Sequence, residues 1–354
     1  MSKILTQESL LNEIAITKAS RFQIIKPIDC DWAKLGKTLR DLSYQSAKMA
    51  NLLVSTLWTQ DVQRNEYKRI HGEYPTEQIN TYKLLREAFP SVGPSLTNQF
   101  EQVIKKKYIS DKKSIFKNEK SVPSYRNMPI YIHNQAWKII EGEENSYIIK
   151  ARLLPQDAEQ YWFSFIVKYK SAGHKNILIK LASGEYKQGM LQILKDGHGK
   201  WYAVPTFSFI AKQRQSEENK VLYVDLTADG IKLQINENEY IETIPIDDIQ
   251  ETLHRFRCRH EKIFNQRKYR GEGRIGHGRQ ALMKPQQGIQ KKIANFKDTK
   301  NHNLSRFIVD YANRRKCTDI AIRDKTFIAD WTIYDLCNKI FYKAKEIGIK
   351  AVEI

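Results

Sequence analysis

The residues with the plainest chemistry in this sequence are basic, and they gather in two segments. Residues 255–315 carry 17 lysines and arginines against four acids, in a chain of formal net charge +19. A second cluster is formed by the lysines of residues 105–120. Clustered positive charge predicts contact with a polyanion, and nucleic acid is the usual one. A solvated helix face would explain either cluster alone, but the two together favour nucleic acid.

The larger basic segment contains a glycine-rich loop at residues 269–279. Its four glycines alternate with Arg270, Arg274, His277 and Arg279. Because glycine has no side chain, such a loop lets the backbone approach phosphates closely, and this favours RNA or DNA contact over a plain flexible connector. The predicted nucleic-acid-binding residues are Lys105, Lys106, Lys107, Lys112, Lys113, Arg257, Arg267, Lys268, Arg270, Arg274, His277, Arg279, Lys291, Lys292, Lys297 and Arg306.

The overall composition narrows the class of protein. The chain has 354 residues, of which 41% are hydrophobic and 28% charged, as is typical of a soluble protein with two or three domains. No apolar run approaches the roughly 18 residues of a membrane span, and a signal-peptide pattern is absent, so we expect a cytoplasmic protein. The four cysteines never form a C-x-x-C pair, which argues against a disulfide framework or a zinc knuckle.

The first two thirds of the chain alternate between strand and helix patterns. Residues 1–17 form an N-terminal extension with a short amphipathic stretch at 5–14, which would be a helix or would fray. Residues 21–27 predict a strand ended by proline, and from Asp31, a plausible N-cap, apolar residues recur at the helical spacing of three and four. From residue 121, strands are expected at residues 147–153, 162–169, 176–181, 190–194 and 201–207. We therefore predict a β-barrel or sandwich with a helical unit inserted into it.

The last third predicts a separate α/β domain. Residues 213–220 are polar and indicate a linker. Residues 221–354 then give three strands, a helix, the glycine-rich loop, a second helix, a strand, a helix and a last strand. This is the order of an RNase H-like sheet, which breaks off where one more helix is expected. The predicted fold is therefore multidomain α+β, with a barrel, an inserted helical domain and a truncated RNase H-like domain.

Short motifs along residues 21–354 carry a family resemblance. They are FQIIKP at 22–27, DW at 31–32, LG at 35–36, HGEYP at 71–75, VPSY at 122–125, GHGR at 276–279, KIANFKD at 292–298, NH at 301–302, SR at 305–306 and the segment 331–348. In these motifs and their order the chain resembles the compact type V-F CRISPR effectors, the miniature Cas-twelve-f family, which are related to the transposon-encoded TnpB nucleases.

The resemblance implies a domain layout and partners. It places a wedge β-barrel at residues 18–30 and 121–212, a helical recognition domain at 31–120 and a RuvC domain at 221–354. The implied partners are a guide RNA, a target DNA duplex and a second copy of the chain in an asymmetric dimer. In this family the pairing of guide and target reads the sequence, while the protein reads a short adjacent motif and the shape of the duplex.

The resemblance also implies a RuvC site in which three carboxylates hold Mg²⁺. Asp225 occupies the first position, although Thr227 replaces the glycine expected after it. Arg323 stands where a glutamate is expected, and a guanidinium cannot coordinate a metal. Asp324 is a poor substitute because neighbouring strand residues point to opposite faces. The third carboxylate and a zinc ribbon are expected beyond the strand on which the sequence ends.

These departures lead us to expect a degenerate, nuclease-dead site, no enzyme activity and neither a magnesium nor a zinc cofactor, with Asp225 a relic or a capping residue. A truncated piece of an active enzyme is the alternative, but truncation does not explain Arg323. The function then implied is guide-directed DNA binding that regulates transcription, by recruiting an extracytoplasmic-function sigma factor and RNA polymerase, on the nucleoid when guided. Repression by promoter occlusion, target selection for a transposition complex, and a nuclease completed by a partner's carboxylates are the alternatives.

Overall fold

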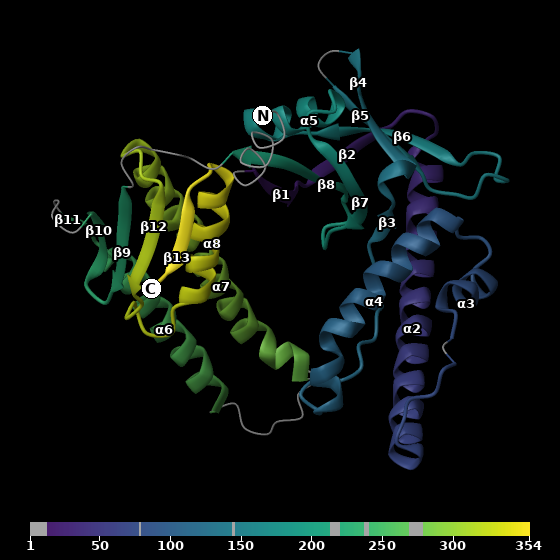
Figure 1. Ribbon diagram of the computed structural model, residues 1–354, viewed down its shortest axis with the longest axis horizontal. Helices are drawn as coiled ribbons and strands as arrows, with labels where there is room; N and C mark the ends of the chain where they lie inside the picture. The colour runs from purple at the N-terminus through teal and green to yellow at the C-terminus, as the bar shows by residue number, and fades with distance from the viewer. Residues whose placement is uncertain (1–12, 78, 144–145, 213–219, 237–240, 269–278) are drawn as a thin grey trace, which may run out of the picture. The chain divides into compact units, whose positions relative to one another are not determined.

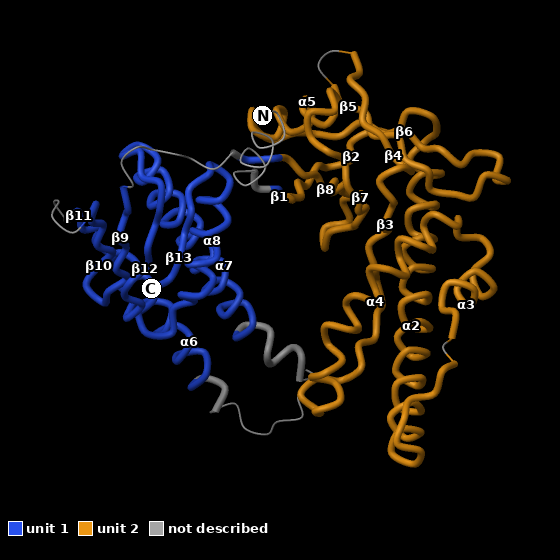
Figure 2. Tube along the Cα trace, viewed as in Figure 1, with its two compact units in different colours: residues 1–16, 210–354 blue, residues 17–209 orange. Residues whose placement is uncertain are grey.

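The computed structural model describes residues 13–354 except 78, 144–145, 213–219, 237–240 and 269–278 (Figure 1). The side chains of residues 13–14, 212, 241, 266–268 and 279–285 also lie outside the described part. The chain divides into two compact units (Figure 2). We call them the barrel unit, Thr17–Phe209, and the C-terminal unit, Ile210–Ile354 with residues 13–16. Most of the expected linker at residues 213–220 falls outside the described residues.

A nearly closed sheet organises the barrel unit. Its strands are β1 (Glu13–Ala19), β2 (Phe22–Pro27), β3 (Ile130–Ile132), β4 (Trp137–Glu141), β5 (Tyr147–Arg152), β6 (Trp162–Lys168), β7 (Lys187–Lys195) and β8 (Trp201–Lys212). Their order is β3-β7-β8-β2-β6-β5-β4, and β1 pairs with β8. Most of the amphipathic stretch at residues 5–14 lies outside the described residues, and the chain is already in a strand at Glu13.

Polar contacts connect β4, at one end of this sheet, to β7, the strand next to the other end. The indole Nε1 of Trp137, on β4, donates to the carbonyl of Gly189, on β7, at 2.9 Å. The Gln188 Nε2 donates to the carbonyls of Asn134 and Trp137 at 2.6 and 2.7 Å. Since these bonds satisfy backbone oxygens on β4, just before it and on β7, they limit the open edge that an unclosed barrel would expose.

One expected strand is a helix. Residues 176–181 lie in α5 (Ala172–Ala182), between β6 and β7. The helix begins where the Ser171 side chain accepts a hydrogen bond from the His174 amide, an N-cap that offsets the β-branched residues inside it. The prediction was wrong because a short apolar run fits a buried strand and a buried helix face equally well.

The helical insertion lies between β2 and β3 and consists of α2 (Trp32–His71), α3 (Thr81–Ala88) and α4 (Pro94–Phe116). The Asp31 carboxylate caps α2 by accepting from the Lys34 amide at 2.7 Å. The same helix ends at Gly72, whose φ of 80° places it in the left-handed region that favours glycine. The sequence thus marks both ends of the longest helix in the barrel unit.

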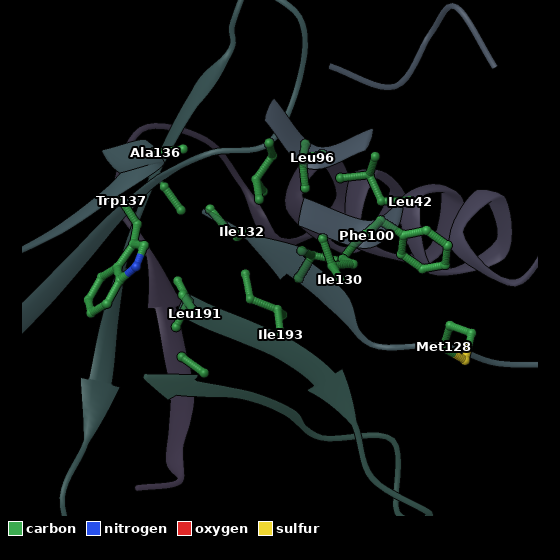
Figure 3. Close-up of a cluster of buried hydrophobic side chains, with 14 of the residues drawn as sticks. Leu42, Leu96, Phe100, Met128, Ile130, Ile132, Ala136, Trp137, Leu191 and Ile193 are labelled. Atoms are coloured by element: carbon green, nitrogen blue, oxygen red, sulfur yellow. The ribbon is translucent and has the colours of Figure 1, made fainter. Parts of the chain in front are cut away.

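The insertion and the sheet share one hydrophobic core. Figure 3 shows Leu42 of α2 and Phe100 of α4 beside Ile130 of β3, with Ile193 of β7 beyond them, and all four side chains are buried. A buried aliphatic side chain contributes roughly 1.5–3 kcal/mol relative to an exposed one. The helices are therefore bound to the barrel by continuous apolar packing.

The C-terminal unit contains a five-stranded sheet with three helices. The strands are β9 (Val221–Thr227), β10 (Gly230–Ile235), β11 (Ile241–Ile244), β12 (Asp319–Asp324) and β13 (Lys350–Glu353), and the helices are α6 (Asp247–Lys268), α7 (Arg279–Arg314) and α8 (Ile333–Glu346). The strand order is β11-β10-β9-β12-β13, with β12 parallel to β9 and β13. The elements follow one another as the sequence predicts.

Alternation along β9 separates the two faces of this sheet. Leu222, Val224 and Leu226 are fully buried in the core that α7 and α8 complete, whereas Tyr223 and Asp225 lie on the other, half-exposed face. The period of two thus directs Asp225 away from the core. None of the described helices is long and apolar enough to span a bilayer.

Candidate nucleic-acid interface and the Asp225 site

The Asp225 carboxylate forms a two-point ion pair with Arg323. The guanidinium Nε donates to Oδ1 at 3.0 Å and Nη2 donates to Oδ2 at 2.7 Å. Nη2 also donates to the Gln234 side-chain oxygen at 3.0 Å, and the guanidinium carbon lies 4.5 Å from the centre of the Tyr223 ring. Paired parallel bonds of this kind are among the strongest that arginine makes.

Alternation along the two strands places these two side chains on the same face, because the pair before them, Ile322 and Val224, is buried on the other face. The pairing of β12 with β9 shifts between Ile322 and Asp324, so that Asp324 stands opposite Asp225. The Asp324 carboxylate instead accepts from the amide and hydroxyl of Thr326, and the amide bond is the largest cause of its lowered pKa. Asp324 therefore closes the turn after β12.

The side chains around Asp225 do not fit a divalent cation. Both oxygens of Asp225 accept from a permanently charged guanidinium, which cannot itself be a ligand. Within the described ranges, no three His, Cys, Asp or Glu side chains are grouped closely enough to hold a metal ion. That the chain uses neither magnesium nor zinc stays a prediction.

The lysine cluster of α4 separates into paired and outward-facing residues. Lys105 pairs with Glu101 at 2.6 Å, and Lys112 pairs with Asp61 at 2.7 Å. The Lys107 ammonium lies 4.9 Å from the centre of the Tyr125 ring. Lys106 and Lys113 are exposed, seven residues apart on one face of the helix, and make no ion pair with the described part of the chain. These two are best placed to meet an external polyanion.

The second basic cluster is described only in part. Arg257 donates to the carbonyl of Ala329 at 3.2 Å and lies 3.4 Å from the Asp330 carboxylate, while Lys297 donates to the Asp330 carbonyl. The structure thus brings these two predicted residues together at the loop before α8. Lys291, Lys292 and Arg306 are exposed on α7. The side chains of Arg267, Lys268, Arg270, Arg274, His277 and Arg279 lie outside the described residues.

Sequence reasoning missed a groove in the barrel unit, which we call the Tyr44 groove. It has a volume of about 640 Å³. Its lining residues are Arg40, Ser43, Tyr44, Asn127, Met128, Pro129, Leu194, Lys195, Asp196 and Trp201. The Tyr44 side chain is 57% exposed, and the Lys48 ammonium lies 4.5 Å from its ring centre. The signal available in the sequence was the spacing of Arg40, Tyr44 and Lys48, which are four residues apart and so share one face of the predicted helix.

Comparison with known proteins places this chain in a family. No protein-family model matches it. A CRISPR-associated endodeoxyribonuclease Cas12f1 of Sulfoacidibacillus thermotolerans is 31% identical to it, over 95% of this chain and 86% of that protein. The chain belongs to the Cas12f family. A second Cas12f1 endodeoxyribonuclease, from Syntrophomonas palmitatica, is 29% identical over 92% of this chain and 69% of that protein.

A solved structure confirms the predicted multidomain α+β fold. A Cas12f1 complex with single guide RNA and target DNA superposes with a TM-score of 0.70, at 15% identity, over 96% of this chain and 89% of that chain. The family resemblance seen in the motifs is therefore confirmed by sequence identity and by fold.

The prediction that this chain is not an enzyme is contradicted by the same comparisons. Both Cas12f1 relatives are named endodeoxyribonucleases, which are enzymes. The prediction was drawn from Arg323 and from the end of the sequence, and these describe one carboxylate site. Changes confined to one site do not decide the class of a protein that matches nucleases along nearly its whole length.

Proposed function

We propose that this chain binds a guide RNA and, with it, a matching DNA duplex. The Tyr44 groove carries the proposal, because it combines an exposed aromatic ring with Arg40 and Lys195 in one cleft, and the Lys48 ammonium lies beside that ring. Nucleobases stack on exposed aromatic rings while neighbouring cations meet the phosphates. The likeness to a Cas12f1 solved with guide RNA and target DNA supports the same function.

The groove is tested with the RNA that copurifies after expression with the native locus. That RNA is sequenced, and a duplex matching its spacer is titrated onto the protein–RNA complex. Tyr44→Ala is expected to weaken duplex or RNA binding by about 5- to 150-fold, the equivalent of 1–3 kcal/mol for one stacked base. Tyr44→Phe keeps the ring and should bind like the wild type. Equal binding by the Ala variant would show that the groove is not a nucleic-acid site.

Cleavage is measured in the same complexes. The Cas12f1 relatives are named endodeoxyribonucleases, so the bound duplex is incubated with Mg²⁺ and with Mn²⁺. Guide-dependent products would assign that activity to this chain. The mass of the complex in solution also tests whether two copies share one guide RNA, as the family resemblance implies.

We propose further that the bound complex regulates transcription by bringing a sigma factor and RNA polymerase to the target. The support for this is the resemblance described above, and no contact of the described residues names the partner. A reporter with guide targets at varied distances upstream of a promoterless gene is tested with and without a co-expressed extracytoplasmic-function sigma factor from the same genome. Activation at a fixed spacing supports recruitment, whereas silencing of a targeted native promoter establishes occlusion.

A further inference from the structure

Arg152, the last residue of β5, lines two adjoining cavities in the barrel unit. One has a volume of about 530 Å³ and is also lined by Arg86, Gly93, Leu154 and Asp157. The other, of about 500 Å³, reaches Tyr82, Asn98, Glu101, His133 and Gln135. Pro94 and Ser95, at the start of α4, line both. We call these cavities together the Arg152 hollow, and it shares no lining residue with the Tyr44 groove.

The Arg152 side chain has no acceptor within the described part of the chain. Its Nε is buried and makes no hydrogen bond, and its guanidinium carbon lies 5.8 Å from the Trp162 ring centre. An unsatisfied buried donor costs about 1–3 kcal/mol, and more when it is charged. Such a group in a native cavity is normally met by an acceptor from outside the chain, an ordered water or a ligand.

The other groups of the hollow leave its charge positive. The Arg86 side chain is fixed beside the hollow because its Nη1 donates to the Val92 carbonyl. The other N–H groups of its guanidinium remain able to donate to a ligand. The Glu101 carboxylate is already engaged by the Thr81 hydroxyl and by Lys105 at 2.6 Å. Asp157 is exposed at the rim. The hollow is therefore lined by two positive guanidinium groups and by one carboxylate, Asp157, that has no ion-pair partner among the described residues.

The start of α4 adds donors of the same kind. Gly93 provides no side-chain cap and Pro94, at the first helical position, has no N–H. The first-turn amides beside Ser95 therefore receive no cap from a side chain, and the positive end of the helix dipole favours an anion there. A guanidinium group beside a helix N-terminus suits the oxygens of a phosphate.

We propose that the Arg152 hollow binds a phosphate group of a nucleic-acid strand. This proposal rests on the function proposed above, since it takes a nucleic-acid strand as the natural ligand. The phosphate-binding groups of the hollow do not depend on the Tyr44 groove. The volume admits a nucleotide as well as its phosphate, since small-ligand sites span roughly 300–1,000 Å³. A backbone phosphate and a terminal phosphate share this chemistry, and the test separates them.

The test measures binding of short RNA and DNA oligonucleotides, with and without a 5′-phosphate, across a salt series. Arg152→Gln is expected to lower affinity about tenfold and to reduce the slope of log affinity against log salt by about one. A loss confined to 5′-phosphorylated strands identifies a terminal phosphate, and an equal loss for all strands identifies a backbone phosphate. Arg152→Lys should keep the slope while losing affinity, because it keeps the charge without the fork.

Lys138→Gln is the matched control, since it removes one exposed positive charge from the same unit outside the hollow. Thermal unfolding of each variant shows whether the fold is kept. Inorganic phosphate is tested alone as a probe, and it should raise the melting temperature of the wild type more than that of Arg152→Gln. If phosphate stabilises the wild type more than Arg152→Gln but no guide-dependent DNA binding is found, the phosphate site is supported and the proposed function is rejected. If Arg152→Gln binds the oligonucleotides with wild-type affinity and an unchanged salt slope, the proposal that the hollow binds a phosphate is wrong.

Discussion

Arg323 and Arg152 each lie at or beside the end of a strand, but only Arg323 has an acid of its own. The Arg323 guanidinium binds both oxygens of Asp225 and lies over Tyr223. Arg152 also has an aromatic neighbour, yet its buried Nε is without an acceptor. An arginine that is paired internally contributes to stability and adds little charge to the surface. One that is left unpaired reduces stability and keeps its charge for a ligand.

The strongest way to break this comparison is Arg323→Glu. The change removes two charge-assisted bonds and sets a second carboxylate beside Asp225, so we expect the C-terminal unit to lose about 3 kcal/mol. Urea unfolding measures the loss. Millimolar Mg²⁺ should restore part of it, because a divalent cation then bridges the two carboxylates. Arg323→Gln is the control and should respond less to Mg²⁺, and an equal response in both variants would contradict this account.

A third cation, Lys343 on α8, sharpens the comparison because its acceptors are neutral. Its ammonium donates to the His302 carbonyl and the Ser305 hydroxyl, each at 2.7 Å. Burial, followed by the nearby charge of Arg306, lowers the pKa of Lys343 to about 8. The folded state therefore releases this proton before the unfolded state does, and stability should rise as the pH increases from about 8 to 10.

The expected gain is about 2 kcal/mol over that range, since one pKa unit corresponds to roughly 1.4 kcal/mol. Chemical unfolding at several pH values measures it. Lys343→Met removes the titrating group and should lose the gain while keeping the apolar stem of the side chain. A wild type and variant with parallel pH profiles would show that the ammonium is not desolvated in solution.

The smallest expected effect is that of Arg152→Met on stability. Because Arg152 has no internal acceptor to lose, we expect the free energy of unfolding to stay within about 0.5 kcal/mol of the wild type, or to rise. Arg323→Met should instead lower it by about 1–2 kcal/mol. Thermal unfolding of both variants gives the contrast. A larger loss for the Arg152 variant would place an internal partner at that residue.

The sequence predicts the order of elements well where burial has a clear period. The alternation in β5 and β9 and the capping carboxylate of Asp31 are local signals, and the structure places strands and a helix there. The sequence-based prediction was wrong at residues 176–181, where a short apolar run fits both a strand and the buried face of α5. Local pattern determines local structure only when one period excludes the other.

The candidate sites depend on contacts that no local pattern contains. Arg323 was expected to repel a metal, and the sequence did not show that its charge would be met by Asp225 across a shifted strand pairing. The Arg152 hollow forms where the end of β5 meets the start of α4, and a single arginine gives no signal of that meeting. Basic clusters were visible, but the acids that pair Lys105 and Lys112 were not.

The core shared by the helical insertion and the barrel also bears on how the chain folds during synthesis. β2 emerges before α2 to α4, whereas its partners β6 and β8 come after them. The helices can pair locally as soon as they are made, but Leu42 and Phe100 stay uncovered until β3 and β7 arrive. Barrel closure therefore depends on contacts between distant segments, which form slowly and leave apolar surface open to aggregation meanwhile. Rapid translation without chaperones should accordingly reduce the soluble yield, mainly through failure of the barrel sheet to close rather than through failure of α2 to α4 to form.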